Sequence, residues 1–195
     1  PMRRLKHKTV ERQSVDKLPA PGERIPAKLC RRLYDLDLLA LGKLADMARR
    51  KKIGSDKGGF VIDRNVTFTN ICVCRCNFCA FYRDNNSKEA FSLTLDQILK
   101  KVGELVRLGG TQVMLQGGLS PAHGLDFYVR MLSAIKEKFP QIYLHSLSPA
   151  EVHYLSVLEH TTHRDILERL RTAGLDSLPG AAEILVDKVR SKVSP

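Results

Sequence analysis

The chain has 195 residues, of which 43% are hydrophobic, so it is long enough to bury the core of one globular domain. Four of its five cysteines lie within residues 72–79, too close together to act as a disulfide framework. Its apolar runs fall short of a membrane span, and its basic start leads into polar sequence rather than the apolar stretch of a secretory signal. We therefore expect a cytoplasmic protein whose reduced thiols serve a metal or a reaction.

The formal net charge of +11 is concentrated near the N-terminus. Residues 1–58 hold 16 Lys and Arg against 7 Asp and Glu, a balance of +9, whereas the remaining residues hold 16 against 14, a balance of +2. The segment with the cysteines is thus nearly neutral. A basic leader of this kind is usually a solvated arm, so we expect neither nucleic acid nor a membrane as a partner.

The first 58 residues divide into two predicted segments. Residues 1–25 are polar, contain prolines and have no sustained period, and we interpret them as a basic flexible arm. Residues 26–58 are predicted to form a helical extension, with Pro26 in the first turn of one helix and a second helix beginning near Asp37. The second helix ends in the basic run Arg49–Lys52, which suits a helix C-terminus. Its apolar stripe consists of Leu38, Leu41, Leu44, Ala45 and Ala48.

From residue 59 onward, predicted strands alternate with predicted helices. The strands are 60–70, 111–116 and 142–146, and the helices are 94–109, 124–140 and 163–174, the first of them capped by Thr94 and closed by Gly109. Strand and helix units of about forty residues indicate a parallel sheet with right-handed crossovers. A complete (β/α) barrel takes roughly 250 residues. We therefore predict an α/β fold in which residues 59–195 form the first half of a TIM-like barrel, with 183–186 beginning a fourth unit.

The unusual residues of this region follow the predicted strands. The cysteines follow the first strand, Gln116-Gly117-Gly118 follows the second, His145 and Ser146 end the third, and Pro179-Gly180 precedes the fourth. In parallel α/β folds the working groups lie at the carboxyl ends of the strands. The sequence therefore predicts one site at one edge of the sheet.

The cysteines have the pattern C-x3-C-x2-C, formed by Cys72, Cys76 and Cys79. Three soft thiolates at this spacing suit a cubane iron–sulfur cluster that keeps one iron without a protein ligand. A structural zinc site would need four ligands in closed geometry, and a reactive thiol group is a third alternative. Cys74 falls inside the three-residue gap, and we interpret it as a non-ligand.

The cysteine pattern with Phe78 before the third cysteine resembles that of radical S-adenosylmethionine (SAM) enzymes. The stretches "DRNVTFTNICVCRCNFCAFYR", "GGTQVMLQGGLSP" and "IYLHSLSPAE" and the segment 167–190 resemble the dehypoxanthine futalosine cyclase family of the futalosine route to menaquinone. The similarity extends from about residue 25 to the end and implies the N-terminal half of such an enzyme. Aminofutalosine synthase and the deazaflavin-forming FO synthase share this layout and remain alternatives.

This resemblance implies a radical SAM barrel with a 4Fe-4S cluster on the three cysteines and SAM on the open iron. A 5′-deoxyadenosyl radical would abstract hydrogen from a nucleoside-derived substrate, which then closes to a spiro ring. An electron donor such as flavodoxin or ferredoxin would reduce the cluster. The implied SAM-binding residues are Gln116, Gly117, Gly118 and Ser148. His145 and Glu151 are implied as catalytic residues.

Two further expectations concern the C-terminal part of the chain. His160 and His163 are expected in an exposed loop and not at a metal. The family pattern has one more small residue between Pro179-Gly180 and Glu183, and its absence would move Glu183 out of position. The hypotheses that compete with an active enzyme are an inactive truncated half barrel and a basic zinc-binding module for nucleic acid.

Overall fold

The computed structural model describes residues 19–20, 22–180 and 185–194. The chain divides into two compact units, Pro1–Gly59 and Phe60–Pro195, and we describe each by itself. Most of the predicted basic arm lies outside the described residues, as do Glu183 and the residues beside it.

Unit 1 contains two helices, α1 (Ala27–Tyr34) and α2 (Leu38–Ile53), close to their predicted places. Asp37 caps α2, because its carboxylate accepts hydrogen bonds from the backbone N–H groups of residues 39 and 40. Gly54 ends the helix with a φ of 70°, a left-handed conformation that glycine adopts without a steric penalty.

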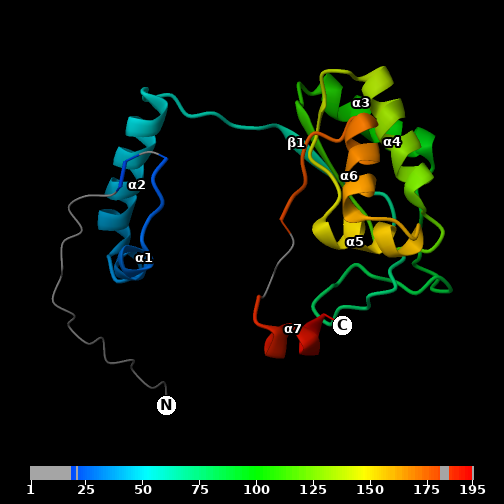
Figure 1. Cartoon of the computed structure of the whole chain (residues 1–195). Coiled ribbons are helices and arrows are strands. Elements are labelled where there is room, and N and C mark those ends of the chain that lie inside the picture. The colour runs from blue at the N-terminus through cyan, green and yellow to red at the C-terminus, as the bar shows by residue number, and fades with distance from the viewer. Residues whose placement is uncertain (1–18, 21, 181–184, 195) are drawn as a thin grey trace, which may run out of the picture. The chain divides into compact units, whose positions relative to one another are not determined.

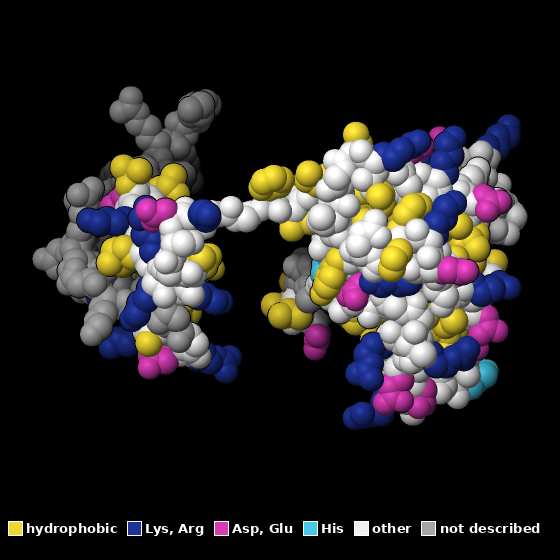
Figure 2. Space-filling model, turned by 90° about the horizontal axis from the view of Figure 1, so that it is seen from above, with side chains coloured by type: hydrophobic (Ala, Val, Ile, Leu, Met, Phe, Trp, Pro, Cys, Tyr) yellow, Lys and Arg dark blue, Asp and Glu magenta, His cyan; other side chains and the backbone are white. Residues whose placement is uncertain are grey.

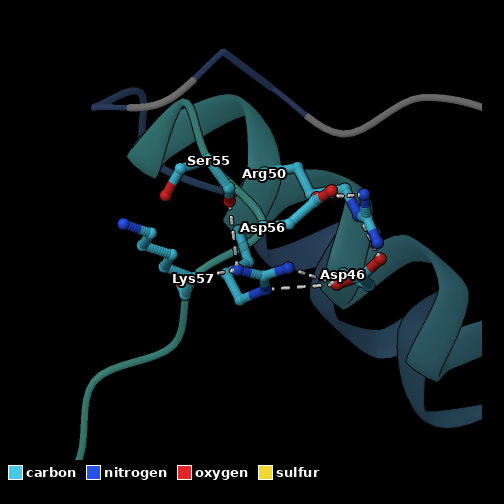
Figure 3. A network of polar contacts seen from close by, with 6 residues as sticks. Asp46, Arg50, Ser55, Asp56 and Lys57 are labelled. Carbon is cyan, nitrogen blue, oxygen red and sulfur yellow. Dashed lines mark hydrogen bonds and ion pairs between the residues drawn. The ribbon is translucent and has the colours of Figure 1, made fainter.

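The basic end of α2 is paired with acidic side chains. Asp46 pairs with Arg49 and Arg50, with N–O distances of 3.0 and 2.7 Å. Figure 3 shows Asp46 and Arg50 within this network of polar contacts. Arg50 also pairs with Asp56, and Arg49 donates to two carbonyls of the loop that follows the helix. These contacts partly neutralise the predicted basic run and fasten the loop to the last turn of α2.

The apolar stripe of α2 is exposed. Within the described part of unit 1, no side chain of α1 or α2 is buried, and Leu38 and Leu39 are more than four-fifths exposed. Figure 2 shows hydrophobic side chains between Lys and Arg side chains over this unit. Within the described residues, the local signals that favour α2 are its Asp37 cap and its helix propensity, whereas α1 has no side-chain cap and neither helix buries a side chain.

Unit 2 contains the alternating elements that the sequence predicts. They are β1 (Asp63–Thr67), α3 (Leu95–Arg107), β2 (Gln112–Gln116), α4 (Leu125–Lys138), β3 (Tyr143–Leu144), α5 (Pro149–Leu158), α6 (His163–Thr172) and α7 (Asp187–Val193). The strands form a parallel sheet in the order β1-β2-β3. This confirms the predicted α/β fold with a parallel sheet.

The core of unit 2 lies between the sheet and the helices α3, α4 and α6 (Figure 1). Burial alternates along β2, where Val113 and Leu115 are fully buried, as expected for a strand. Leu132 and Ile135 of α4 and Ile98 of α3 are fully buried as well. This core fixes the register of the strands, and with it the place of the loops at their ends.

The ends of α3 confirm the predicted boundary signals. Thr94 and Gln97 form a capping box, in which each side chain bonds the backbone of the other residue. Gly109 follows the helix with a φ of 77°, and the N–H of Gly110 returns to the carbonyl of Leu105 at 2.9 Å.

The fourth unit predicted at 183–186 falls partly outside the described residues, since 183 and 184 are not among them. Residues 185–186 have no regular secondary structure. Before Pro179-Gly180, Ser177 pairs with His145 in an isolated parallel bridge, and the N–H of Ser146 donates to the carbonyl of Ser177 at 2.9 Å. This bridge continues the sheet beyond β3.

Two helices were not predicted, α5 and α7. Ser148 caps α5, Pro149 occupies its first turn and Glu151 lies three residues after the cap, a standard sequence signal for a helix start. Ser148 and Glu151 were predicted only as site residues, without a helix. His163 is also the first residue of α6 rather than a loop residue, because Thr162 and Asp165 form a capping box before it.

Among the described residues, no helix is both long enough and apolar enough to span a membrane.

Candidate functional site

The cysteine loop, which we define as residues 71–83, follows β1 directly. The thiols of Cys72, Cys76 and Cys79 are free and half-buried, whereas the residues between them, such as Arg75 and Phe78, are exposed. Arg75 has a φ of 48°, a left-handed conformation, inside the three-residue gap. The loop thus keeps its thiols partly shielded while the intervening side chains face solvent.

Two buried polar residues before the cysteines hold this loop to the sheet. Thr69 Oγ1 donates to the carbonyl of Phe91 at 2.8 Å, and it accepts a hydrogen bond from the N–H of Ile71. Asn70 bonds the backbone of Glu89 and Phe91 through its side-chain amide, at 2.9 and 2.8 Å. Both residues therefore tie the cysteine loop to segment 89–91, the structural role that their position suggests.

The glycines after β2 pack tightly against the first part of the same loop. A Cβ on Gly118 would lie 2.2 Å from the carbonyl oxygen of Ile71 and 2.8 Å from Cβ of Cys72. A Cβ on Gly117 would lie 2.4 Å from the ring of Phe68. Only glycine fits at either position. The Gln116-Gly117-Gly118 loop and Cys72 are therefore in direct contact.

Cys74 lies in the same loop as a half-buried thiol. Burial raises its pKa, and the neighbouring thiols of Cys72 and Cys76 raise it further. Its role as a non-ligand stays a prediction.

Glu151 is buried beside the glycine loop. It lies in the first turn of α5, its side chain is 3% exposed, and its Oε1 accepts a hydrogen bond from the N–H of Gly117 at 3.2 Å. Burial raises the pKa of Glu151 to about 7, and hydrogen bonds from Ser148 and Gly117 oppose this rise. Ser148, which is also buried, accepts from the N–H of Glu151 at 3.3 Å as the helix cap.

The strand-to-helix turn before Ser148 contains an unusual backbone conformation. Leu147 is fully buried and has a φ of 59°, which costs a branched side chain about 1–2 kcal/mol. Its N–H donates to the carbonyl of Leu115 at 2.9 Å. The buried side chain and this bond hold the turn so that Ser148 and Glu151 face the end of β2.

His145 directly follows β3 and is half-buried. Its Nδ1 lies 2.6 Å from Oγ of Ser177, the residue with which it forms a parallel bridge. The Ser177 hydroxyl orients the imidazole ring of His145, so Nε2 is the ring nitrogen that this contact does not use.

Two residues that the sequence analysis did not select lie close to these groups. Burial and then the thiols of Cys72 and Cys74 raise the pKa of Tyr154, which places this α5 side chain near the cysteine loop. His123, in the loop after β2, stacks on Phe127 with a centroid distance of 4.1 Å, and burial lowers its pKa. The position of His123 after a predicted strand could have marked it as a site residue, but nothing in the sequence indicated that its side chain is buried.

The structure thus brings most of the predicted site residues together. Cys72 contacts Gly118, Gly117 bonds Glu151, and Glu151 bonds Ser148, so three loops from three strands meet at one edge. His160 is exposed, and the Nε2 of His163 lies 3.0 Å from Nδ1 of His153 on the surface. These surface histidines lie in and after α5, and no metal role follows from them.

The donor chemistry of the cysteine loop suits an iron–sulfur cluster. Cys72, Cys76 and Cys79 are free thiols on one loop, and soft thiolates are the ligands that such clusters take. A cubane cluster with three protein ligands places each thiolate on a different iron. The residue types present therefore fit the group.

Comparison with known proteins gives the class. The sequence profile of the radical SAM superfamily matches residues 66–195, and the chain belongs to this superfamily. Its members are enzymes that generally use a 4Fe-4S cluster and SAM.

The chain is similar to two groups of curated enzymes. It is 38% identical over 185 residues to the cyclic dehypoxanthine futalosine synthase of Streptomyces coelicolor, covering 93% of this chain and 46% of that protein. It is 40% identical over 164 residues to the 5-amino-6-(D-ribitylamino)uracil–L-tyrosine 4-hydroxyphenyl transferase of Cyanothece sp., covering 81% of this chain and 43% of that protein. The chain therefore spans less than half the length of these relatives.

A solved structure supports the fold assignment. The crystal structure of methylornithine synthase matches with a TM-score of 0.66 at 20% identity, covering 89% of this chain and 49% of that one. This likeness confirms the predicted partial radical SAM barrel.

Proposed function

We propose that this chain is the cluster-bearing part of a radical SAM cyclase that converts dehypoxanthine futalosine to its cyclic form. The observation that carries the proposal is the contact between the first cysteine of the C-x3-C-x2-C loop and the glycine pair after β2. It supports a cofactor site in which the cluster and SAM occupy neighbouring loops.

Cys72, Cys76 and Cys79 would hold three irons of a 4Fe-4S cluster in this site. The bound cluster, with SAM on its open iron, supplies the electron that cleaves SAM and thereby provides a radical for hydrogen abstraction from the substrate. The protein contributes binding, orientation and the exclusion of water. A cytosolic electron carrier such as flavodoxin or ferredoxin would reduce the cluster.

The glycine loop would bind SAM through its backbone. Because Gly117 and Gly118 lack side chains, their backbone lies directly against Phe68 and the first part of the cysteine loop, and Gln116 adds an amide at the end of β2. Glu151 holds the N–H of Gly117 in place, and Ser148 orients Glu151 from the start of α5. In this arrangement Glu151 positions the SAM loop, and its raised pKa allows it to hold a proton near neutral pH.

His145 would contact the substrate. Because its Nδ1 bonds Ser177, its Nε2 is the nitrogen available for a ribose hydroxyl or a carboxylate. The proposed role is to bind the substrate or to move a proton at that nitrogen.

The extent of sequence similarity favours the cyclase over the transferase. The cyclase match includes 185 residues and the transferase match 164, at nearly equal identity. The additional matched length means that more of this chain follows the cyclase pattern. The transferase reaction remains the second candidate, because 40% identity over the cluster region does not separate the two substrates.

Anaerobic reconstitution of the chain with iron and sulfide tests the proposal. We expect about four irons per chain, and 5′-deoxyadenosine after addition of SAM and a strong reductant. Alanine at Cys72, Cys76 or Cys79 should abolish both, whereas Cys74→Ala should retain the iron. A chain that retains its iron without these three thiols contradicts the proposal, and stoichiometric zinc without iron supports the zinc-binding alternative instead.

The substrate is tested separately by product analysis. Dehypoxanthine futalosine is supplied in one reaction, and L-tyrosine with 5-amino-6-(D-ribitylamino)uracil in the other. We expect substrate-dependent 5′-deoxyadenosine and a cyclised product only in the first. Product only in the second reaction would replace the cyclase by the transferase, and a cluster without SAM cleavage would identify an inactive half barrel.

A further inference from the structure

The C-terminal end of α7 lies against the cysteine loop (Figure 1). The backbone N–H of Asn77 donates to the carbonyl of Val193 at 2.9 Å, and its Nδ2 donates to the carbonyl of Lys192 at 2.9 Å. The last carbonyls of a helix have no partner inside the helix. Asn77 satisfies two of them and fastens α7 to the loop.

The residue after α7 contacts a cysteine. Oγ of Ser194 lies 3.2 Å from Sγ of Cys76, and both side chains are half-buried. Because Cys76 and Asn77 are adjacent, the three contacts act together. We call residues 76–77 and 192–194 the α7 clasp.

We propose that Ser194 is a positioning residue for the middle cysteine of the cluster site, held in place by Asn77; this inference rests on the proposed function. A thiolate bound to iron has no proton, so the Ser194 hydroxyl is the donor in the contact with Cys76. A hydrogen bond to a cluster sulfur favours the reduced, more negative state and raises the reduction potential. Ser194 therefore influences the electron transfer without touching the substrate.

The clasp also shields Cys76 when no cluster is present. Local opening of α7 from the loop is needed before a reagent reaches this thiol freely. A variant without one of the clasp bonds should open more often. The metal-free chain therefore provides a readout that does not depend on enzyme activity.

The first experiment measures alkylation of the reduced, metal-free chain by iodoacetamide, cysteine by cysteine, with peptide mass spectrometry. We expect Ser194→Ala and Asn77→Ala to speed modification of Cys76 by about fivefold, the change expected for one lost hydrogen bond. Ser191→Ala is the matched control, because Ser191 is an exposed serine of the same helix. Cys79 should react at the same rate in all variants.

The second experiment measures the midpoint potential of the reconstituted cluster by a titration monitored with electron paramagnetic resonance. Ser194→Ala should shift the midpoint potential to more negative values. Ser194→Thr should keep the wild-type potential because threonine retains the hydroxyl. Ser191→Ala should also leave the potential unchanged. A purely structural role of Ser194 would not produce this order.

The outcomes separate the inference from the proposed function. A chain that binds iron but shows neither the alkylation change nor the potential shift overturns the role of Ser194 and leaves the cluster assignment intact. A chain that binds no iron overturns the proposed function and, with it, the assignment of Ser194 to a cluster. An alkylation change without a potential shift also overturns the proposal, because the clasp would then be a cover only.

Discussion

The helices α2 of unit 1 and α3 of unit 2 both begin with a side-chain cap, but only α3 buries side chains in a core. In unit 1, α2 has a side-chain cap, a glycine end and a paired basic run, yet none of its side chains is buried and Leu38 and Leu39 are largely exposed. In unit 2, α3 has the same kind of cap and buries Ile98, Val102 and Leu105. Local signals thus suffice to form a helix, whereas burial against the sheet supplies the free energy that fixes a site.

The largest expected difference between the two units is in the loss of unfolding free energy when a leucine is replaced by alanine. Leu132→Ala, at a fully buried position of α4, should reduce the free energy of unfolding by about 2–5 kcal/mol. Leu39→Ala, at an exposed position of α2, should change it by less than about 0.5 kcal/mol. Urea unfolding followed by circular dichroism measures both. Equal losses would mean that the leucines of α2 are buried in solution.

A buried carboxyl should make the stability of unit 2 depend on pH. Because the pKa of Glu151 rises from its ordinary value near 4.5 to about 7 on folding, the folded state retains a proton that the unfolded state releases. Wild-type stability should therefore fall as the pH rises from about 4.5 to about 7, by about 3 kcal/mol in total. Glu151→Gln removes this term.

The stability advantage of the Glu151→Gln variant should thus grow between pH 5 and pH 7 and stay constant above pH 8. Urea unfolding of the metal-free chain at these pH values tests it. A difference that does not change with pH would mean that Glu151 is hydrated.

A single methyl group should distinguish the tight loop of unit 2 from the open loop of unit 1. Gly118→Ala forces Cβ against the backbone of Ile71, and overpacking of this kind destabilises by about 1–3 kcal/mol. Gly58→Ala is the matched control, since nothing lies within 4 Å of its added Cβ. Unfolding free energies measure the difference, and an unaffected Gly118→Ala variant would mean that the cysteine loop is free to move away.

The smallest effect is expected at the end of α2. Hydrogen bonds from Arg50 and Arg49 lower the pKa of Asp46, so these contacts persist above the usual carboxyl range and weaken as the pH falls through the lowered pKa. This pH dependence is opposite in sign to that of Glu151. Asp46→Asn should increase amide hydrogen exchange only in the last turn of α2, and a global change would mean that unit 1 supports unit 2.

The sequence predicted the elements with strong local signals. Thr94 and Gly109 mark the ends of α3, and the alternation at Val113 and Leu115 identifies β2. The three thiols were selected from their spacing, and their roles as ligands stay a prediction. We did not predict α5, although the residues from Ser148 onward carry a helix start, because Ser148 and Glu151 were considered only as site residues.

Long-range contacts were beyond sequence reasoning. The bond from Gly117 to Glu151, the pair of His145 and Ser177 and the contact of Ser194 with Cys76 join residues 32 to 118 positions apart. No periodicity encodes such distances, since they follow from sheet register and helix packing. The same limit explains why the bridge between His145 and Ser177 was not predicted.

The absence of free space at Gly118 has a consequence for how the site tolerates change. Cys72 follows β1 and Gly118 follows β2. The distance between their backbones is therefore set by the pairing of these two strands and not by the length of a side chain. A substitution that shifts β1 against β2 should therefore move the first thiol relative to the glycine backbone, because the same pairing carries both. A substitution confined to the exposed surface of the outer helices should leave their spacing unchanged.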